Sequence, residues 1–172
     1  GIIALGDGSA GMYGKNGTRL RNLGTVTAGN ASAGIMTSGA GSLAINNGGI
    51  ALGAGSQGIY LKDGADIQNN ASGSITSSGA GTVGMYADNV SNPIVNGGTI
   101  QLLGDKSIGI YISENGTKTI NNTNRIEIGS SNLAEDPSIG IFNNNINGTV
   151  NNSSDIISGK NSINIYNKGG QI

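Results

Sequence analysis

Two glycine-rich segments match the pattern in which three glycines approach the phosphates of a dinucleotide. They span residues 6–11 and 53–58, and each follows a short apolar run. A dinucleotide site also needs a helix that opens at this loop and an acidic residue about 20 positions further on. Here the loop is followed by Met-Tyr at 12–13 or Ile-Tyr at 59–60, which favour a strand. We therefore interpret both segments as corners and predict no cofactor.

Acidic residues are too few and too scattered for the usual metal-binding or hydrolytic sites. Of seven Asp residues, only Asp63 and Asp66 lie near each other. Calcium-binding β-rolls place an Asp in every short repeat, and glycoside hydrolysis needs two carboxylates about 5–9 Å apart. Glu127 is expected on a strand between Gln101 and Ile157, without a second carboxylate. His and Cys are absent, which excludes Ser-His-Asp triads, disulfides and His/Cys zinc sites. We predict no metal, no catalytic residue and no enzymatic activity.

The composition favours β-structure with many tight turns. The 172 residues include 32 Gly and 24 Asn, which disfavour helix, and 24 Ile, which are too many for a disordered chain. The net charge of −1 gives the chain no excess of positive charge with which to bind the phosphate groups of nucleic acid. No apolar run approaches the roughly 18 residues of a membrane helix, so this segment is not expected to lie in a membrane. The sequence begins in the middle of a pattern, and we expect it to be a segment of a longer chain.

One five-residue phrase recurs seven times and organises the chain. It reads Ser or Thr, any residue, Gly, an apolar residue, and then an aromatic residue or Met. Successive copies begin 23 to 31 residues apart. Such an interval indicates a repeat architecture rather than a globular α/β fold. The copies begin at Ser9, Ser32, Ser56, Thr82, Ser107, Ser138 and Ser162, and the last has Asn164 in place of Gly.

Two further short strands accompany each phrase at the same period. An alternating strand such as 100–102 lies upstream, and a strand that ends in Asn, such as 94–96, lies downstream. Three strands and three corners describe one coil of a parallel β-helix, in which coils about 4.8 Å apart bury a shared interior. We predict an all-β fold that forms a single segment over residues 1–172. It has about seven coils of 23–31 residues, with three short strands per coil.

The repeat also predicts which side chains face the interior. Alternation within the phrase places the second and fourth residues, such as Ile108 and Ile110, in the core and turns the Gly and the Tyr outward. The Gly would then leave room beside the ring. The Asn at the end of each downstream strand is expected to stack into a hydrogen-bonded ladder. Its predicted members are Asn22, Asn46, Asn69, Asn96, Asn121 and Asn151.

The Ser-Ile-Gly-Ile-Tyr phrase at 107–111 and Ile-Val-Asn-Gly-Gly-Thr-Ile at 94–100 resemble the passenger regions of large type V autotransporter adhesins, in particular the fusobacterial kind. The resemblance covers the whole chain through its degenerate repeat. It implies a right-handed β-helix displayed on the bacterial cell surface, outside the outer membrane, and anchored by a translocator barrel that this chain does not contain. It also implies adhesion to host cells or partner bacteria, with roles in coaggregation, biofilm and virulence. The absence of Cys agrees with export of an unfolded chain through the periplasm.

Aromatic residues gather at the last position of the phrase, where they predict a stacked column. The column would stabilise the sheet. Tyrosine is also favoured in contacts with partners. We therefore take Tyr60, Tyr86 and Tyr111 as candidate partner-binding residues for sugar rings or protein side chains. The full set is Tyr13, Tyr60, Tyr86, Tyr111, Phe142 and Tyr166, with Met36 at the remaining copy.

A second candidate is the insertion loop, residues 129–137, which extends one repeat to 31 residues. Solenoids often carry recognition loops as insertions on one coil. Leu133, Glu135 and Asp136 are its candidate partner-binding residues, since they add an apolar side chain and an acidic pair to a chain poor in charge. A loop without a binding role is the simpler interpretation.

The sequence therefore predicts a monomeric, rigid stalk whose partner is a protein or glycan receptor on a host cell or another bacterium. Two other classes stay open. One is a polysaccharide-binding or -processing β-helix, which would show turnover and a grooved acidic cluster. The other is a phage or fibre spike segment, which would be a homotrimer.

Overall fold

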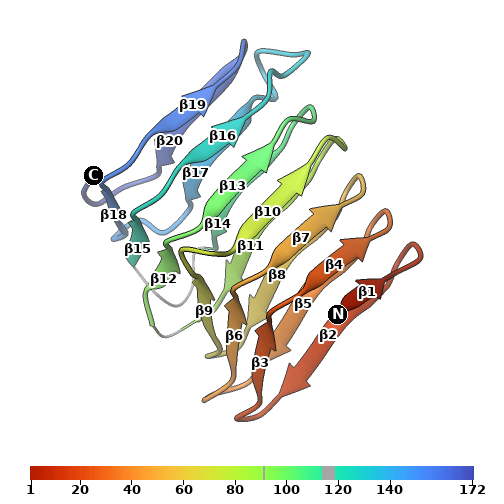
Figure 1. Cartoon of the computed structure of the whole chain (residues 1–172). Coiled ribbons are helices and arrows are strands. Elements are labelled where there is room, and N and C mark those ends of the chain that lie inside the picture. The colour runs from red at the N-terminus through yellow and green to blue at the C-terminus, as the bar shows by residue number, and fades with distance from the viewer. Residues whose placement is uncertain (91, 114–118) are drawn as a thin grey trace.

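The structure is a β-solenoid built of three parallel sheets. The computed structural model describes residues 1–90, 92–113 and 119–172, which contain 20 strands and no helix. Each of the first six coils adds one strand to every sheet, and the last adds β19 and β20 to the first two sheets, so the chain advances steadily from β1 to β20 (Figure 1). The predicted parallel β-helix with three strands per coil is confirmed. No helix capable of crossing a membrane occurs in the described ranges.

The strands of each sheet follow one another in chain order, seven in the first two sheets and six in the third. The first sheet contains β1 (Ile2–Ala4), β4 (Thr25–Ala28), β7 (Gly49–Leu52), β10 (Ser74–Ser77), β13 (Thr99–Leu102), β16 (Ile126–Ile128) and β19 (Ile156–Ser158). The second contains β2 (Ala10–Lys15), β5 (Ala33–Ser38), β8 (Gln57–Lys62), β11 (Val83–Asp88), β14 (Ile108–Ile112), β17 (Ser138–Asn143) and β20 (Ser162–Asn167). The third contains β3 (Arg19–Asn22), β6 (Leu43–Asn46), β9 (Asp66–Asn69), β12 (Ile94–Asn96), β15 (Thr119–Asn122) and β18 (Thr149–Asn152).

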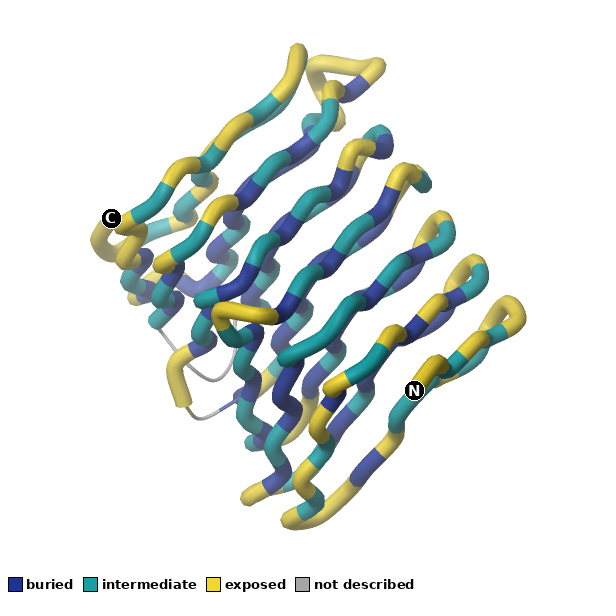
Figure 2. The backbone as a smooth tube through the Cα atoms, in the orientation of Figure 1, coloured by how far each residue is buried: buried dark blue, intermediate teal, exposed yellow. Residues whose placement is uncertain are grey.

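The core is a set of columns in which equivalent apolar residues stack on one another. In the first sheet the column runs through Ile50, Ile75, Ile100 and Ile126, all of them nearly inaccessible to solvent. Buried residues recur along every middle coil, whereas many corner residues and the two end coils are more exposed (Figure 2). Stacking removes each apolar side chain from water on both sides, which a single coil could not do.

The second strand of each coil departs from the predicted alternation. Ser107, Ile110 and Ile112 are buried, whereas Ile108 is only half-buried and lies on the outer face together with Tyr111. Our assignment of Ile108 to the core was therefore wrong, whereas Ile139, at the same position of the next coil, is buried as predicted. The strict alternation of the strand breaks at the phrase Gly. Gly109 and Ile110 are consecutive and both buried, although neighbouring strands keep the same register on either side of the Gly.

The phrase Gly faces the interior rather than the space beside the ring. A Cβ atom on Gly84 would lie 2.5 Å from the carbonyl oxygen of Gly109 and 2.9 Å from Cγ2 of the buried Ile100. Both contacts are closer than van der Waals packing allows. Gly therefore permits the close approach of successive coils. Asn164, which occupies the same position in β20, is exposed in this structure.

Asparagine forms a ladder on the third sheet that is buried except at its last member. The Nδ2 of each member donates to the Oδ1 of the next, at distances of 2.6–2.9 Å. The side-chain oxygen also accepts from a corner amide, as Asn22 does from Gly24. The predicted ladder is confirmed through Asn96, but its last two members are not Asn121 and Asn151, which lie on the outer face. The ladder runs through Asn22, Asn46, Asn69, Asn96, Asn122 and Asn152.

Gly84→Ala should destabilise the fold by about 1–3 kcal/mol, because the new methyl group must displace backbone of the next coil. Asn164→Ala, at the same repeat position but exposed in this structure, should leave the stability of this chain nearly unchanged. Urea denaturation followed by circular dichroism measures both free energies of unfolding. Equal stabilities for the two variants would contradict the proposed role of the glycine.

Candidate partner-binding surface

The predicted tyrosine column lies on the outer face of the second sheet. Its residues align in register from β2 to β20, with Met36 between Tyr13 and Tyr60. The structure therefore brings Tyr60, Tyr86 and Tyr111 together as neighbours on three consecutive strands. All three are half-buried, so part of each side chain remains open to solvent.

Ring stacking determines which part of each tyrosine a partner can reach. The Tyr86 ring lies between those of Tyr60 and Tyr111, with centroids 5.1 and 4.8 Å away and interplanar angles of 23° and 20°. Both faces of the Tyr86 ring are therefore covered, which leaves its edge and hydroxyl group for contacts. Further along the column, Phe142 packs edge-on against Tyr111 and Tyr166.

The same crowding changes the acidity of Tyr86. Burial between the two neighbouring rings raises the pKa of its phenol, and the nearby Tyr111, Asp88 and Tyr60 raise it further. Tyr86 therefore remains a neutral hydrogen-bonding group at physiological pH.

The insertion loop is attached to the preceding coil through Asp105. One carboxylate oxygen of Asp105 accepts from the backbone N–H of Asn132 at 2.9 Å and lies 2.9 Å from Oγ of the buried Ser131. Its other oxygen accepts from Nδ2 of Asn132 at 2.8 Å. The backbone hydrogen bond from Asn132 is the main cause of the lowered pKa of Asp105, helped by the bonds from Ser131 and the Asn132 side chain. The carboxylate thus orders the start of the loop in its ionised form.

The three candidate residues of the loop differ in availability. Asp136 is paired with Lys106, with 2.7 Å between Oδ2 and Nζ, and this pairing raises the pKa of the lysine. Leu133 is 46% exposed, and Glu135 is also exposed. Leu133 and Glu135 can therefore meet a partner directly, whereas Asp136 would first have to exchange its contact with Lys106.

The tyrosine column and the insertion loop are separate parts of the surface. The loop joins β16 to β17 and lies at a corner, whereas Tyr60 is on β8, three coils away, and Tyr111 is on β14, one coil away. Three steps between parallel strands amount to about 14 Å along the solenoid axis. Tyr60 and the insertion loop are therefore too far apart to form one small site, and the loop lies at a corner whereas the tyrosines lie on the strands.

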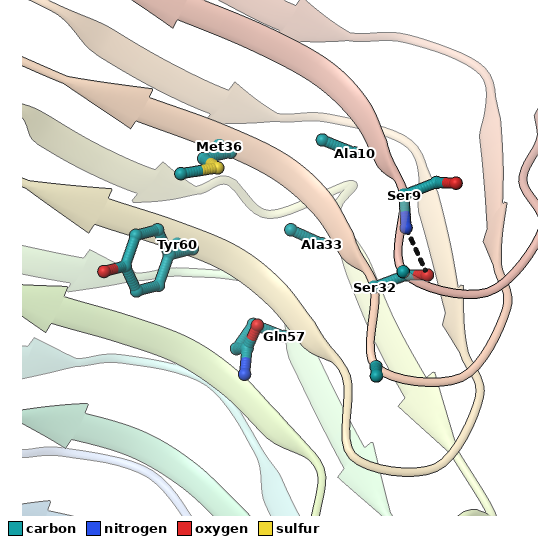
Figure 3. A pocket seen from close by; sticks show the side chains of 9 residues that line it. Ser9, Ala10, Ser32, Ala33, Met36, Gln57 and Tyr60 are labelled. Atoms are coloured by element: carbon teal, nitrogen blue, oxygen red, sulfur yellow. Dashed lines mark hydrogen bonds between the residues drawn. The ribbon is translucent and has the colours of Figure 1, made fainter.

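A shallow depression on the second sheet is a feature that the sequence analysis missed. It has a volume of about 280 Å³ and opens on the outer face beside Tyr60 (Figure 3). The signal was present in the alignment of the phrases, where the first two copies have Ala at the second position and the second copy has Met instead of Tyr. The lining residues are Gly8, Ser9, Ala10, Ala31, Ser32, Ala33, Met36, Gln57 and Tyr60.

The acidic residue considered for hydrolysis has structural partners. Glu127 pairs in register with Gln101 and Ile157, as predicted. Its Oε2 accepts from Gln101 Nε2 at 2.8 Å and from Arg125 at 2.9 Å. Within the described residues, no group of three or more acidic, His or Cys side chains is placed to hold a metal ion.

Comparison with known proteins adds no assignment to this geometry. No protein-family model, curated protein or solved structure matches the chain.

Asp105→Ala should release the insertion loop while leaving the solenoid intact. The Asn132 amide should then exchange its proton faster, as measured by hydrogen-exchange NMR, with an unchanged circular dichroism spectrum. In the wild type, because the pKa of Asp105 is lowered on folding, the protection of this amide should persist at neutral pH. It should be lost only as the pH falls below the range of an ordinary aspartate. Asp155→Ala, at another corner, is the matched control, and equal exchange in both variants would argue against anchoring by Asp105.

Proposed function

We propose that this chain is a rigid segment of a bacterial surface adhesin of the autotransporter type, which extends from the outer membrane and presents contacts along its side. It works by binding and not by chemistry. Its partner is a receptor on a host cell or another bacterium, and the segment acts as a monomer.

The observation that carries this proposal is the continuity of the three sheets. Every described coil hydrogen-bonds to its neighbours through parallel strands, and the asparagine ladder connects six successive coils. A solenoid of this kind is stiff along its axis because each repeat is fixed to the next by both backbone and side-chain bonds. Stiffness suits a stalk that must hold its contacts away from a cell.

The surface chemistry agrees with adhesion through many weak contacts. The outer face of the second sheet repeats a half-buried tyrosine at strand spacing, and tyrosine combines an apolar ring with a polar tip. The resemblance of the repeat to adhesin passengers supports the same conclusion. Glu127 instead has its partners within the fold, so it gives no support to a polysaccharide-processing enzyme.

Binding of the purified, fluorescently labelled protein to epithelial cells and to partner bacteria tests the proposal. We expect saturable binding by the wild type. Replacing Tyr60, Tyr86 and Tyr111 together by Val should weaken binding at least tenfold, because the edges and hydroxyls of the rings are lost. Asn121→Ala, on the outer face of the third sheet, is the matched control and should bind like the wild type.

A second variant separates the two surfaces. Residues 129–137 can be replaced by Leu-Gly-Asp-Lys, the sequence of the equivalent corner at 103–106. Loss of binding in this variant alone would assign recognition to the insertion loop. Absence of binding by the wild type would contradict an adhesive role for this segment. A homotrimer in light scattering would favour a fibre spike instead.

A further inference from the structure

We infer that the depression beside Tyr60 is a binding site for a single uncharged sugar ring. This inference rests on the proposed adhesive function and names the class of ligand. The depression occurs on β2, β5 and β8, on the same outer face as the tyrosine column.

The depression exists because three side chains are smaller or more flexible than their counterparts in other coils. At the second position of the phrase, the first two coils have Ala10 and Ala33. From the fourth coil on, this column contains Val83 and then Ile, which fill the equivalent space. Met36 interrupts the aromatic column beside Ala33, so the coil has no ring at that place.

Tyr60 begins the continuous stack of rings, because Met36 separates it from Tyr13. Unlike Tyr86, it has a neighbouring ring on one side only. Tyr86 covers one side of the Tyr60 ring, at 5.1 Å between centroids. The neighbour of Tyr60 on the other side is Met36, not a ring, and both residues line the depression. An aromatic ring next to a flexible thioether forms an apolar wall that suits the C–H face of a pyranose.

Gln57 supplies the polar part of the site. It projects from the same strand as Tyr60 and lines the depression (Figure 3). Its side-chain amide forms no hydrogen bond with any residue that the structure describes, although it is half-buried. A free amide offers one acceptor and two donors, which matches a pair of adjacent sugar hydroxyls. An apolar wall with one convergent polar group is the usual composition of a small-ligand site.

The charge and size of the site restrict the class of ligand further. None of the lining residues carries a charge, so a neutral ligand fits better than a sialic acid, a phosphate or a charged peptide. The volume of about 280 Å³ is just below the roughly 300–1,000 Å³ of pockets that enclose drug-sized ligands. One ring fits inside, and the rest of a glycan would extend along the open face.

Saturation-transfer NMR with the methyl glycosides of glucose, galactose, mannose and N-acetylglucosamine tests this inference. At least one glycoside should bind, with a dissociation constant on the order of 1–10 mM, as expected for a single ring in an open site. Ala33→Ile should weaken that binding at least tenfold by filling the depression, and Ile is the natural residue at this position in β14 and β17. Ile139→Val, in the same column but outside the depression, is the control.

Gln57→Leu provides a test that does not depend on the fold tolerating a larger residue at 33. It should reduce glycoside binding while retaining an apolar surface of similar size. Binding of N-acetyl-phenylalanine amide in place of every glycoside would show that the site accepts a protein side chain, which overturns the inference. So would glycoside binding that Ala33→Ile leaves unchanged, or no glycoside binding at all. Sugar binding without cell adhesion would contradict the proposed function alone, and adhesion without sugar binding would contradict this site alone.

Discussion

In-register stacking of parallel coils is the constraint on which the rest of the molecule depends. Because each coil lies one strand spacing from the next, every side chain has its own counterpart as a neighbour. A residue type persists in a column only when it packs well on itself. Ile fills space in the core, Asn both donates and accepts, and Tyr stacks on Tyr. Gly recurs for the opposite reason, since the backbone of the following coil occupies the place of its side chain.

The period of the sequence was sufficient to predict the coil, because the same constraint repeats each residue type at a fixed interval. It was not sufficient to predict the phase of the second strand. Ile108 is as apolar as Ile110, so composition does not distinguish the outer residue from the inner one. The distinction comes from Gly109, which faces the interior together with the next residue, Ile110, so that the alternation is broken between Ile108 and Ile110.

The error in the asparagine ladder has a different cause. Asn121 and Asn122 are adjacent, and either could end the strand. Side chains on one face of a strand are two residues apart, so a buried Ile120 requires the inward Asn at 122. The same spacing relates Ile94 to Asn96 and Val150 to Asn152. Alternation alone could therefore have assigned the ladder correctly, whereas the depression beside Tyr60 depends on the packing of three strands.

Repetition stabilises the rod but also limits what its surface can recognise. A stacked tyrosine uses both faces of its ring on its neighbours, so a long unbroken column offers a partner only a row of edges and hydroxyl groups. Specific recognition needs a place where a ring face or a free polar group is exposed, and this requires a break in the repeat. Met36 interrupts the column of rings, and the small side chains of Ala10 and Ala33 leave further space beside it. The insertion loop is a second break, at a corner where Asp105 holds it in place. Binding capacity in this solenoid is therefore expected where its repeat is least regular.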